Sequence, residues 1–464
     1  MYNEALVEVT SNSKQGMNQV AISRSLMNKW GLMASTTIKV NIGHLAIQAN
    51  VIPINSNTPK IVLSKAHNAK LSIPKPCKLY AYYNQKSIRL GPVVGVVVSS
   101  PKFEEVSTHF LQSHTTGRPM LLYKFRPQDI NWRSRKVNGS FLQRSGKGMR
   151  WHKATAPFPN VIYNQIISRK FYSTPLYKRF FERVYHTRST IFNHKNFNKS
   201  DMYTFISNDP ELKAHLPLMH ISPSIHQIEE LLKNSTSVFL KPLKGSGGQG
   251  IYKISRRSSS RQYYCEAIFG TTKVSKPYSS LTQLIRNHIP KLSSYLVQQG
   301  VELKRYGEDF FDLRVQLNKN GKNEWVVAAI GANINHPSKI TTHGGWIKTG
   351  PYVLNEVFRQ RAGVIEDKIK KVSKRIGYVL EKGYGHELGD LGIDLGVDQD
   401  GRVWIFEANS APGRHIFKHE LLKPLHRKSD HLMMDYCQYL FRKQNDKFFP
   451  SMRSTRVAKL RKLK

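Results

Sequence analysis

Cysteine is scarce in this sequence of 464 residues. The three cysteines, Cys77, Cys265 and Cys437, lie far apart and form no Cys-x-x-Cys pair. An odd number of widely spaced cysteines argues against a disulfide framework and against a cysteine-ligated zinc site. We therefore expect reduced thiols that pack as ordinary side chains in a reducing compartment.

Long apolar runs are also missing. No stretch of about 18 apolar residues occurs, and the first residues lack the basic-then-apolar layout of a secretory signal. The longest apolar stretch, Val93 to Val98, has the length of a strand. With 39% hydrophobic and 22% charged residues the chain can bury a core, and its length suits about two to four domains. These features predict a cytoplasmic protein without a transmembrane segment.

Acidic residues are few. The chain has 72 Lys and Arg against 31 Asp and Glu, a formal net charge of +41. Eighteen cations and two acids lie between Arg118 and Lys199, and nine cations and one acid lie from Phe441 to the C-terminus. Such a field attracts polyanions, including nucleic acids, acidic polymers, anionic membranes and acidic protein surfaces. Because no nucleic-acid motif accompanies the charge, specific nucleic-acid binding is not favoured, and a basic surface that serves solubility stays an alternative.

Residues 1–90 have the pattern of a small, separate β-rich domain. Val20 to Leu32 and Ile61 to Ile73 align at an offset of 41 residues, and each holds a short apolar strand, a serine, a helical turn and a closing Leu or Ile. Strand-like segments follow at Thr37 to Val40 and at Lys78 to Tyr82. A duplicated strand-helix-strand unit predicts a pseudo-symmetric β-barrel. Chance similarity between the two segments is the alternative.

Strands and helices alternate in the rest of the chain, which predicts an α/β (α+β) fold. Residues 91–200 begin with an apolar strand, Gly91 to Ser100, of the kind that is buried in parallel sheets. The elements expected within 201–440 are helices at 225–233 and 364–381, strands at 237–241, 295–299, 311–317 and 324–332, and a hairpin at 392–408. Residues 441–464 would form a basic C-terminal tail.

The predicted hairpin has a register that brings two acids together. The Asp-Gly pair at 400–401 suits a two-residue turn, which would pair Gln399 with Arg402. Counting back from that pair places Asp394 directly opposite Glu407. Side chains that face each other in this way have Cβ atoms about 5 Å apart.

This pair of acids predicts a metal site. Glu407 and Asn409 are two residues apart and share a strand face, so two carboxylates and an amide oxygen would converge without a pairing arginine. Carboxylates this close repel unless a cation lies between them, and oxygen ligands favour Mg²⁺ or Mn²⁺. The predicted ligands are Asp394, Glu407 and Asn409. An ordinary hairpin with surface carboxylates is the alternative.

A glycine-rich segment lies upstream of the hairpin. Lys241 ends a predicted strand, and the loop that follows contains Gly245, Ser246, Gly247, Gly248 and Gly250. Glycines let backbone amides approach phosphate oxygens, and Lys241 offers a compact positive charge. The segment has neither a Walker nor a Rossmann motif, so by itself it fits a surface hairpin equally well. Further along, Phe310 to Leu317 places Asp312 and Arg314 on one strand face. An arginine among apolar neighbours is more often functional or paired than free, and a purely structural ion pair with Asp312 is the alternative.

The order of these features resembles the ATP-grasp superfamily: a strand that ends in Lys, a glycine loop, an adenine hinge, an Arg strand, then Asp and Glu-x-Asn. From about Leu90 onward the chain resembles the YheC/YheD branch, known as endospore coat-associated proteins. The resembling segments are GPVVGVV, FPNVIYNQI, Ile191 to Tyr203 and FEANSAPG. The resemblance implies an ATP-grasp fold, with a Rossmann-like pre-ATP-grasp domain at 91–200 and an ATP-grasp domain at 201–440. The lid would span about 201–300 and the metal-binding half about 301–440.

The same resemblance implies a role for each site residue. These are Lys199 and Lys241 for the ATP phosphates, Gly245, Ser246, Gly247, Gly248 and Gly250 for the lid, the backbone of Gln298, Gln299, Gly300 and Val301 for adenine, Glu302 for the ribose, and Asp394, Glu407 and Asn409 for Mg²⁺. Arg314 and Lys241 would be catalytic, and Arg314 would neutralise the transferring phosphate or orient the acyl-phosphate. Departures put turnover in question: Gln249 stands where Lys is frequent, Gly392 where some ligases place a phosphate-binding Arg, and Tyr, Ser and Asn residues near Lys199 where relatives often have Trp.

Three functions follow from these patterns. The first is an ATP- and Mg-dependent carboxylate–amine or carboxylate–thiol ligase that works through an acyl-phosphate on an acidic peptide or polymer, with a link to the spore coat. The second is a spore-coat-associated structural protein that keeps the fold without turnover, and the third is nucleic-acid or polyanion binding. The segment Gly331 to Trp346, with Asn333, Asn335 and His343, suits a substrate-facing loop or a purely structural one. The expected locations are the cytoplasm, including that of the mother cell, and the spore coat, where coat proteins would be partners.

Overall fold

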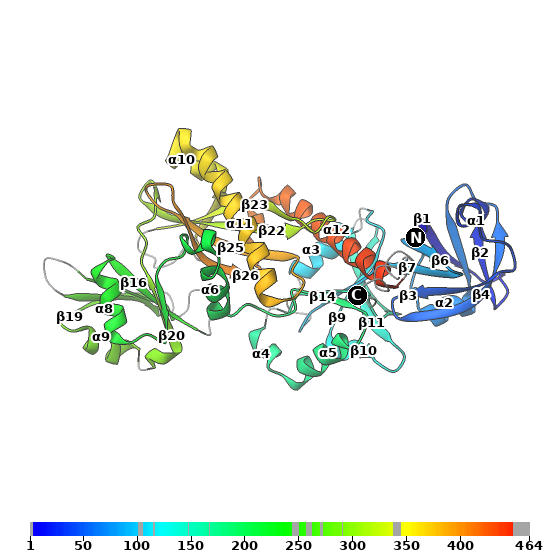
Figure 1. The fold of residues 1–464 in the computed structure, drawn as a ribbon, viewed down its shortest axis with the longest axis horizontal. Helices are drawn as coiled ribbons and strands as arrows, with labels where there is room; N and C mark the ends of the chain where they lie inside the picture. Colours follow the sequence, from blue (N-terminus) through cyan, green and yellow to red (C-terminus); the bar gives the residue numbers. More distant parts are fainter. Residues whose placement is uncertain are drawn as a thin grey trace, which may run out of the picture.

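The computed structural model describes residues 3–100, 105–114, 117–146, 148–166, 168–243, 250–256, 262–269, 272–289, 291–336 and 345–448. Within these ranges the strands form one closed barrel and three open sheets. Figure 1 shows an elongated arrangement, with the N-terminal barrel at one end and the sheet that contains β16 and β20 at the other. No helix in the described part of the chain is both long enough and apolar enough to cross a bilayer.

The barrel has the strand order β1-β5-β2-β4-β3-β7-β6. Its elements are β1 (Asn3–Asn12), β2 (Gln19–Ser23), α1 (Arg24–Trp30), β3 (Thr37–Ile42), β4 (Leu45–Ile54), β5 (Lys60–Ser64), α2 (Lys65–Leu71), β6 (Cys77–Asn84) and β7 (Ser87–Gly91). The pair β2-α1 recurs as β5-α2 at an offset of 41 residues. Gly31 and Ser72, which follow the two helices, both adopt the left-handed conformation. The repeated sequence pattern therefore corresponds to repeated elements of the barrel.

The next sheet has the order β10-β11-β9-β8-β13-β14, and β12 pairs with β11. Its elements are β8 (Val93–Val97), α3 (Glu105–His114), β9 (Leu121–Phe125), β10 (Ile130–Asn131), β11 (Lys136–Ser145), β12 (Gly148–Pro157), β13 (Val161–Asn164), α4 (Arg169–Tyr172), α5 (Pro175–Tyr185) and β14 (Thr190–Phe192). Strand β8 is parallel to β9 and β13, and all its residues are buried. The buried parallel strand that the sequence predicts is confirmed, because both faces of this part of the sheet are covered.

The third sheet, β15-β20-β16-β17-β18-β19, is antiparallel. The elements of this region are α6 (Lys199–Ser207), α7 (Pro210–Lys213), β15 (Met219–Ile221), α8 (Ile225–Lys233), β16 (Ser237–Pro242), β17 (Tyr252–Arg256), β18 (Tyr263–Phe269), β19 (Thr272–Tyr278), α9 (Leu281–His288) and β20 (Tyr295–Gln299). Helices α8 and α9 bury Leu231, Leu232 and Leu284 in a core that they share with β16 and β20. This sheet therefore has an apolar core of its own.

The fourth sheet has the order β24-β23-β22-β25-β26, with β21 on β22. Its elements are β21 (Arg305–Tyr306), β22 (Asp309–Lys319), β23 (Trp325–Asn335), β24 (Trp346–Thr349), α10 (Gly350–Phe358), α11 (Ala362–Tyr384), β25 (Asp390–Val397), β26 (Val403–Asn409) and α12 (Lys423–Phe448). Short 3-10 turns occur at Pro127–Asp129, Leu292–Ser294, Arg359–Arg361 and His415–Lys418. Helix α11 buries an apolar stripe, including Ile369 and Ile376, against the sheet.

Helix α12 corrects the expected start of the basic tail. Residues 441–448 are the last turns of this helix rather than the beginning of a tail. Phe441 is fully buried and packs edge-on against Tyr82 of the barrel, with ring centroids 5.6 Å apart. The aromatic residue within this basic segment was a sequence signal that the segment packs against the barrel. The number of charges alone indicated an exposed tail. Residues 449–464 lie outside the described residues.

The hairpin of β25 and β26 has a different turn from the predicted one. The Asp398 N–H donates to Arg402 O, and the Gly401 N–H donates to Asp398 O, each over 3.1 Å. The turn is therefore one residue longer than expected, and Val397 pairs with Val403. A β-bulge then shifts the register back between Asp394 and Leu395, so that Asp394 lies opposite Glu407. The predicted acid pair is confirmed, although the predicted turn, with Gln399 opposite Arg402, is wrong.

Candidate functional site

Three cations from three different elements converge on the two hairpin acids. Arg314 of β22 places Nη1 2.5 Å from Asp394 Oδ1. Lys199, the first residue of α6, places Nζ 3.8 Å from Glu407 Oε1. Lys241 of β16 is close enough to Lys199, Glu407 and Asp394 for their charges to shift its pKa. The structure thus gathers into one site residues that the sequence separates widely.

Arg314 has a different partner from the expected one. It lies directly opposite Asp394 in the β22–β25 register and binds that carboxylate. The expectation that no arginine pairs with the acids is therefore wrong, and the alternative of an ion pair with Asp312 is not what the structure shows. Asp312 instead accepts a hydrogen bond from Asn333 Nδ2 over 2.8 Å. The error arose because alternation along β22 says nothing about which strand lies beside it.

Gly392 leaves the space that Arg314 uses. A Cβ atom at this glycine would lie 3.1 Å from Arg314 Nε and 2.7 Å from Pro412 Cβ. Any larger side chain would have to displace the guanidinium. Some ligases of the resembling superfamily have a phosphate-binding arginine at the position of Gly392. In this chain the guanidinium of Arg314 lies beside that position.

Lys241 has an unusual electrostatic environment. Burial and the nearby charge of Lys199 lower its pKa to about 8, and the charges of Glu407 and Asp394 oppose this shift. Its Nζ donates to Gln298 Oε1 over 2.5 Å. A lysine in this state changes its charge near pH 8, and a bound anion would favour its charged form.

The predicted adenine hinge is partly occupied by internal hydrogen bonds. The Gln299 N–H donates to Leu218 O and the Gly300 N–H donates to Ser237 O, each over 2.8 Å. A Cβ at Gly300 would lie 2.3 Å from Ser237 Oγ, so this close approach requires glycine. These two N–H groups are therefore not available to a base. Of the hinge residues, Glu302 is exposed and Val301 is half-buried.

The predicted metal ligands lie together on β25 and β26. The side chains of Asp394 and Glu407 are 20% and 30% exposed, so each can still accept a ligand from the solvent side. Asn409 lies opposite Gly392, two residues beyond Glu407 on the same strand. Two opposed carboxylates and an amide oxygen fit a hard divalent cation. The neighbouring cations favour an anionic group on the same side.

Part of the predicted lid lies outside the described residues. This applies to Gly245, Ser246, Gly247 and Gly248, to Gln249, and to His343 of the second loop. Gly250 is described and has φ of +70°, and a Cβ on it would lie 3.6 Å from Pro242 Cγ. The end of the lid segment is thus close to the strand that carries Lys241.

A polar chain beside Arg314 was missed from the sequence. His415 contacts Asn333 Oδ1 through Nε2 over 3.1 Å, and Asn333 in turn donates to Asp312. His415 follows the hairpin, whereas Asn333 belongs to β23, 82 residues earlier. No local pattern connects them, although Asn333 was already a candidate for a substrate-facing role. These three hydrogen-bonded side chains extend the polar surface of the site along β22 and β23.

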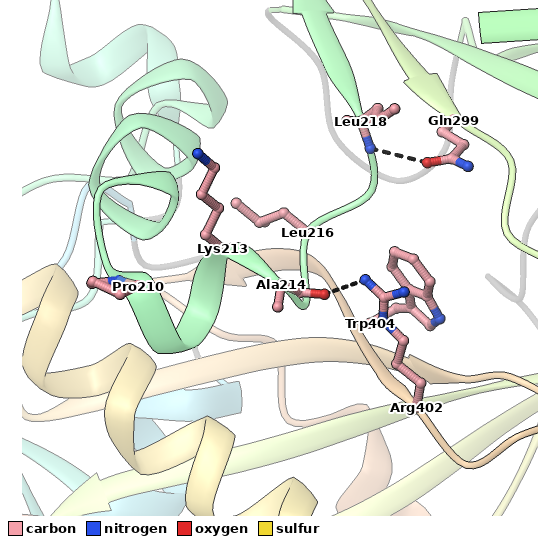
Figure 2. Close-up of a pocket in the computed structure, with 8 residues that line it drawn as sticks. All are labelled: Pro210, Lys213, Ala214, Leu216, Leu218, Gln299, Arg402 and Trp404. Atoms are coloured by element: carbon pink, nitrogen blue, oxygen red, sulfur yellow. Dashed lines mark hydrogen bonds between the residues drawn. The ribbon is translucent and has the colours of Figure 1, made fainter. Parts of the chain in front are cut away.

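An open pocket of about 520 Å³ lies beside the hinge, and Figure 2 shows the residues that line it. Its lining residues are Pro210, Lys213, Ala214, Leu216, Leu218, Gln299, Arg402 and Trp404. Arg402 donates to the Ala214 carbonyl and lies 3.8 Å from the centroid of the Trp404 ring. This described lining contains none of the three cations of the site. The pocket is therefore a neighbouring feature at the link between α7 and β15.

Comparisons of the sequence with known proteins match the chain to one family. The family model described as YheC/D like ATP-grasp matches residues 188–440. Endospore coat-associated protein YheD of Bacillus subtilis (strain 168) is 29% identical over 454 residues, which cover 93% of this chain and 95% of that protein. Endospore coat-associated protein YheC of the same organism is 23% identical, and the match covers 70% and 89% of the two chains. The resemblance drawn from the sequence is confirmed.

Solved structures are more distant in sequence. D-alanyl-alanine synthetase A from Vibrio cholerae has a TM-score of 0.44 and 12% identity, covering 77% of this chain and 99% of that chain. VanG D-Ala:D-Ser ligase from Enterococcus faecalis has a TM-score of 0.43 and 12% identity, covering 76% and 99%.

Proposed function

Because the chain belongs to the YheC/D like ATP-grasp family, we propose that it is an ATP-dependent ligase that joins a carboxylate to an amine or thiol. The observation that supports this proposal most is the convergence of Lys199, Lys241 and Arg314 on the opposed acids Asp394 and Glu407. Cations beside a pair of carboxylates suit a site that binds a metal together with phosphate groups. The ligase chemistry needs positioning and charge neutralisation, and no covalent nucleophile from the protein.

The nucleotide would lie between the third and fourth sheets. Lys199 and Lys241 would bind phosphate oxygens, and the hinge from Gln298 to Glu302 would hold adenine and ribose through the groups not used internally. Asp394, Glu407 and Asn409 would hold Mg²⁺, which supplies neutralisation of phosphate charge when bound. Because Asp394 already binds Arg314, this arginine would stand next to the transferring group.

The reaction would proceed in two transfers. A substrate carboxylate oxygen attacks the γ-phosphorus of ATP, the bond to the β-phosphate oxygen breaks, and ADP leaves. The amine or thiol then attacks the acyl carbon, loses a proton, and expels inorganic phosphate. Arg314 would stabilise charge on the phosphoryl group in both steps, and protonated Lys241 would hold the phosphates in line with the attacking carboxylate.

The substrate class follows from the surface charge. Exposed cations occur along the basic stretch between Arg118 and Lys199. They include Arg144, Arg150, Lys153, Lys178 and Arg179. A polyanion approaching this surface gains from the release of counterions and from electrostatic steering. We propose an acidic peptide or polymer as the carboxylate substrate, in the cytoplasm or at the spore coat, since the relatives are named endospore coat-associated.

Calorimetric titration with a non-hydrolysable ATP analogue, with and without Mg²⁺, tests the nucleotide site. The proposal predicts Mg²⁺-dependent binding that Lys241→Ala removes. Lys322→Ala is a matched control, because Lys322 lies in the turn between β22 and β23 and pairs with none of the site residues. Binding that is equal in both variants would contradict the assignment. Trapping of an acyl-phosphate with hydroxylamine, together with ADP release, then tests turnover on acidic peptides.

A structural protein without turnover is the second candidate. The Arg314–Asp394 ion pair favours it, because the arginine occupies an oxygen that a metal would need. On this alternative the protein binds nucleotide weakly or not at all and releases no ADP with any carboxylate. Nucleic-acid binding remains third, and it would require a steep salt dependence together with sequence preference.

A further inference from the structure

Two helices outside the candidate nucleotide site bring four polar side chains together. Helices α3 and α12 pack side by side (Figure 1). His109 and Ser113 are four residues apart on α3, and His426 and Asp430 are four residues apart on α12. Residues with this spacing share a helix face. Each helix therefore presents one pair to the other where the two pack together.

The contacts in this cluster are short. His109 Nδ1 lies 2.5 Å from Asp430 Oδ2, and Ser113 Oγ donates to the same oxygen over 2.8 Å. The rings of His109 and His426 are parallel, with centroids 3.3 Å apart. One potential ligand atom from each of His109, His426 and Asp430 lies within 4.8 Å of the others. Two imidazoles and one carboxylate are thus already assembled within reach of a single ion.

His426 has an unsatisfied nitrogen inside this cluster. Its side chain is buried, with 9% of the residue exposed, and its Nε2 has no hydrogen-bond partner among the described residues. The ring of Phe417 covers its other face, with centroids 4.4 Å apart. A buried nitrogen without a partner costs free energy, and most such groups in proteins are paired.

We propose that His109, His426 and Asp430 bind one late first-row divalent metal ion, with Zn²⁺ as the representative ion. Imidazole nitrogens suit Zn²⁺ and its neighbours, whereas Mg²⁺ prefers an all-oxygen site such as the hairpin. Ser113 would hold the Asp430 carboxylate in place as an outer partner. The ion would join α3, which follows β8, to α12, which runs from the fourth sheet to the barrel. It would therefore tie together parts of the chain that the nucleotide site does not connect.

Metal loading requires a rotation of one ring. An ion bound by both imidazoles must lie in the plane of each ring, and the two planes are parallel, with an angle of 3° between them. One imidazole must therefore turn out of the stack when the ion enters. His109 has the freedom to do so, because its side chain is 32% exposed, whereas His426 is held by Phe417.

The test uses the full chain after treatment with a chelator and dialysis. Zn²⁺ is titrated by calorimetry in a buffer that contains Mg²⁺, and Co²⁺ is added separately to read ligand-field absorption. We expect one Zn²⁺ per chain, a higher melting temperature with Zn²⁺, and a Co²⁺ spectrum with nitrogen ligands. His426→Gln and Asp430→Asn should weaken Zn²⁺ binding at least about 100-fold, and Ser113→Ala about 10-fold.

Controls separate this site from surface binding and from misfolding. His431→Gln removes an imidazole next to Asp430 that bonds the backbone of Ser113 but is not one of the three proposed ligands, and it should leave Zn²⁺ affinity unchanged. His109→Gln changes the most exposed member and provides a variant with little risk to folding. Nucleotide binding should be the same in all variants. If chelator-treated wild-type protein takes up no Zn²⁺, or if His426→Gln and His431→Gln lose affinity equally, the cluster is a metal-free His–Asp pair.

Discussion

The two aspartates of strand β25 make an instructive comparison. Asp390 and Asp394 are four residues apart and lie on one face of the strand. Asp390 is fully buried, whereas the side chain of Asp394 is 20% exposed. Both bind an arginine: Arg414 Nη2 lies 2.8 Å from Asp390 Oδ2, and Arg314 binds Asp394.

The difference between them lies in the other partners. Asp390 also accepts hydrogen bonds from Tyr163 of β13 and from Gln316 and Asn318 of β22. Its two oxygens are thus enclosed by groups from its own sheet and from the second sheet. Asp394 faces Glu407 and keeps a side open to solvent. A carboxylate that the protein encloses joins structural elements, and one that the protein leaves open can bind a ligand.

The largest effect should come from the enclosed end of the strand. Arg414→Met leaves the Asp390 carboxylate buried without its charge partner, and the free energy of unfolding should fall by about 3–5 kcal/mol. Denaturant unfolding followed by circular dichroism measures this loss. The double variant Arg414→Met with Asp390→Leu removes both charges and should recover part of the stability. A single variant as stable as the wild type would show that the hydrogen bonds to Asp390 are sufficient.

Changes at the open end should affect binding rather than folding. Asp394→Asn with Glu407→Gln should lower Mg²⁺-dependent nucleotide affinity at least about 100-fold, or about 2.7 kcal/mol. The ligand-free melting temperature should fall less than in Arg414→Met, because the amide at position 394 can still accept from Arg314 and the acids lie at a site that is partly open to solvent. Calorimetry and thermal unfolding of the same samples separate the two effects. Unchanged nucleotide affinity would contradict the metal assignment.

The pH dependence of nucleotide binding tests the charge of Lys241 beside the open acid pair. Lys241 loses its proton near pH 8 in the ligand-free protein, so affinity should fall above this pH by up to about 10-fold per pH unit. The unfolded chain holds this proton more tightly than the folded one, so the contribution of Lys241 to stability should rise between pH 8 and its ordinary pKa. Titrations from pH 6.5 to about 9.5, with Lys241→Arg as the pH-independent control, measure the effect. A flat wild-type profile would contradict it.

The smallest effect concerns the turn that sets the hairpin register. Gly401 has φ of +80°, and a Cβ on it would lie 2.9 Å from Ile365 Cδ1. Gly401→Ala should therefore destabilise the protein by about 1 kcal/mol. Gly363→Ala is the control, because this glycine of α11 has no atom within 4 Å of its Cβ position, and that change should stabilise the helix slightly. Equal behaviour of the two variants would show that the turn does not constrain the hairpin.

Local patterns predicted much of the fold. The apolar strand Val93–Val97, the helix at 225–233 and the repeat in the barrel follow from periodicity and short spacings, which act within a single element. The pairing of Asp394 with Glu407 was also predicted, but from a wrong turn. The longer turn shifts the register by one residue, and the bulge between Asp394 and Leu395 shifts it back. An Asp-Gly pair is compatible with turns of two or three residues, so local chemistry could not choose between them.

Tertiary structure decided which side chains meet across the sheets and helices. Arg314 binds Asp394 rather than Asp312 because β22 lies beside β25, a pairing that no spacing in the sequence encodes. His109 meets Asp430 across 321 residues because α3 packs on α12. The sequence by itself determined many of the elements, the acid pair of the hairpin and the family to which the chain belongs. The partners of the charged residues depended on the packing of distant elements, because the energy of an ion pair or metal site is set by distances in space.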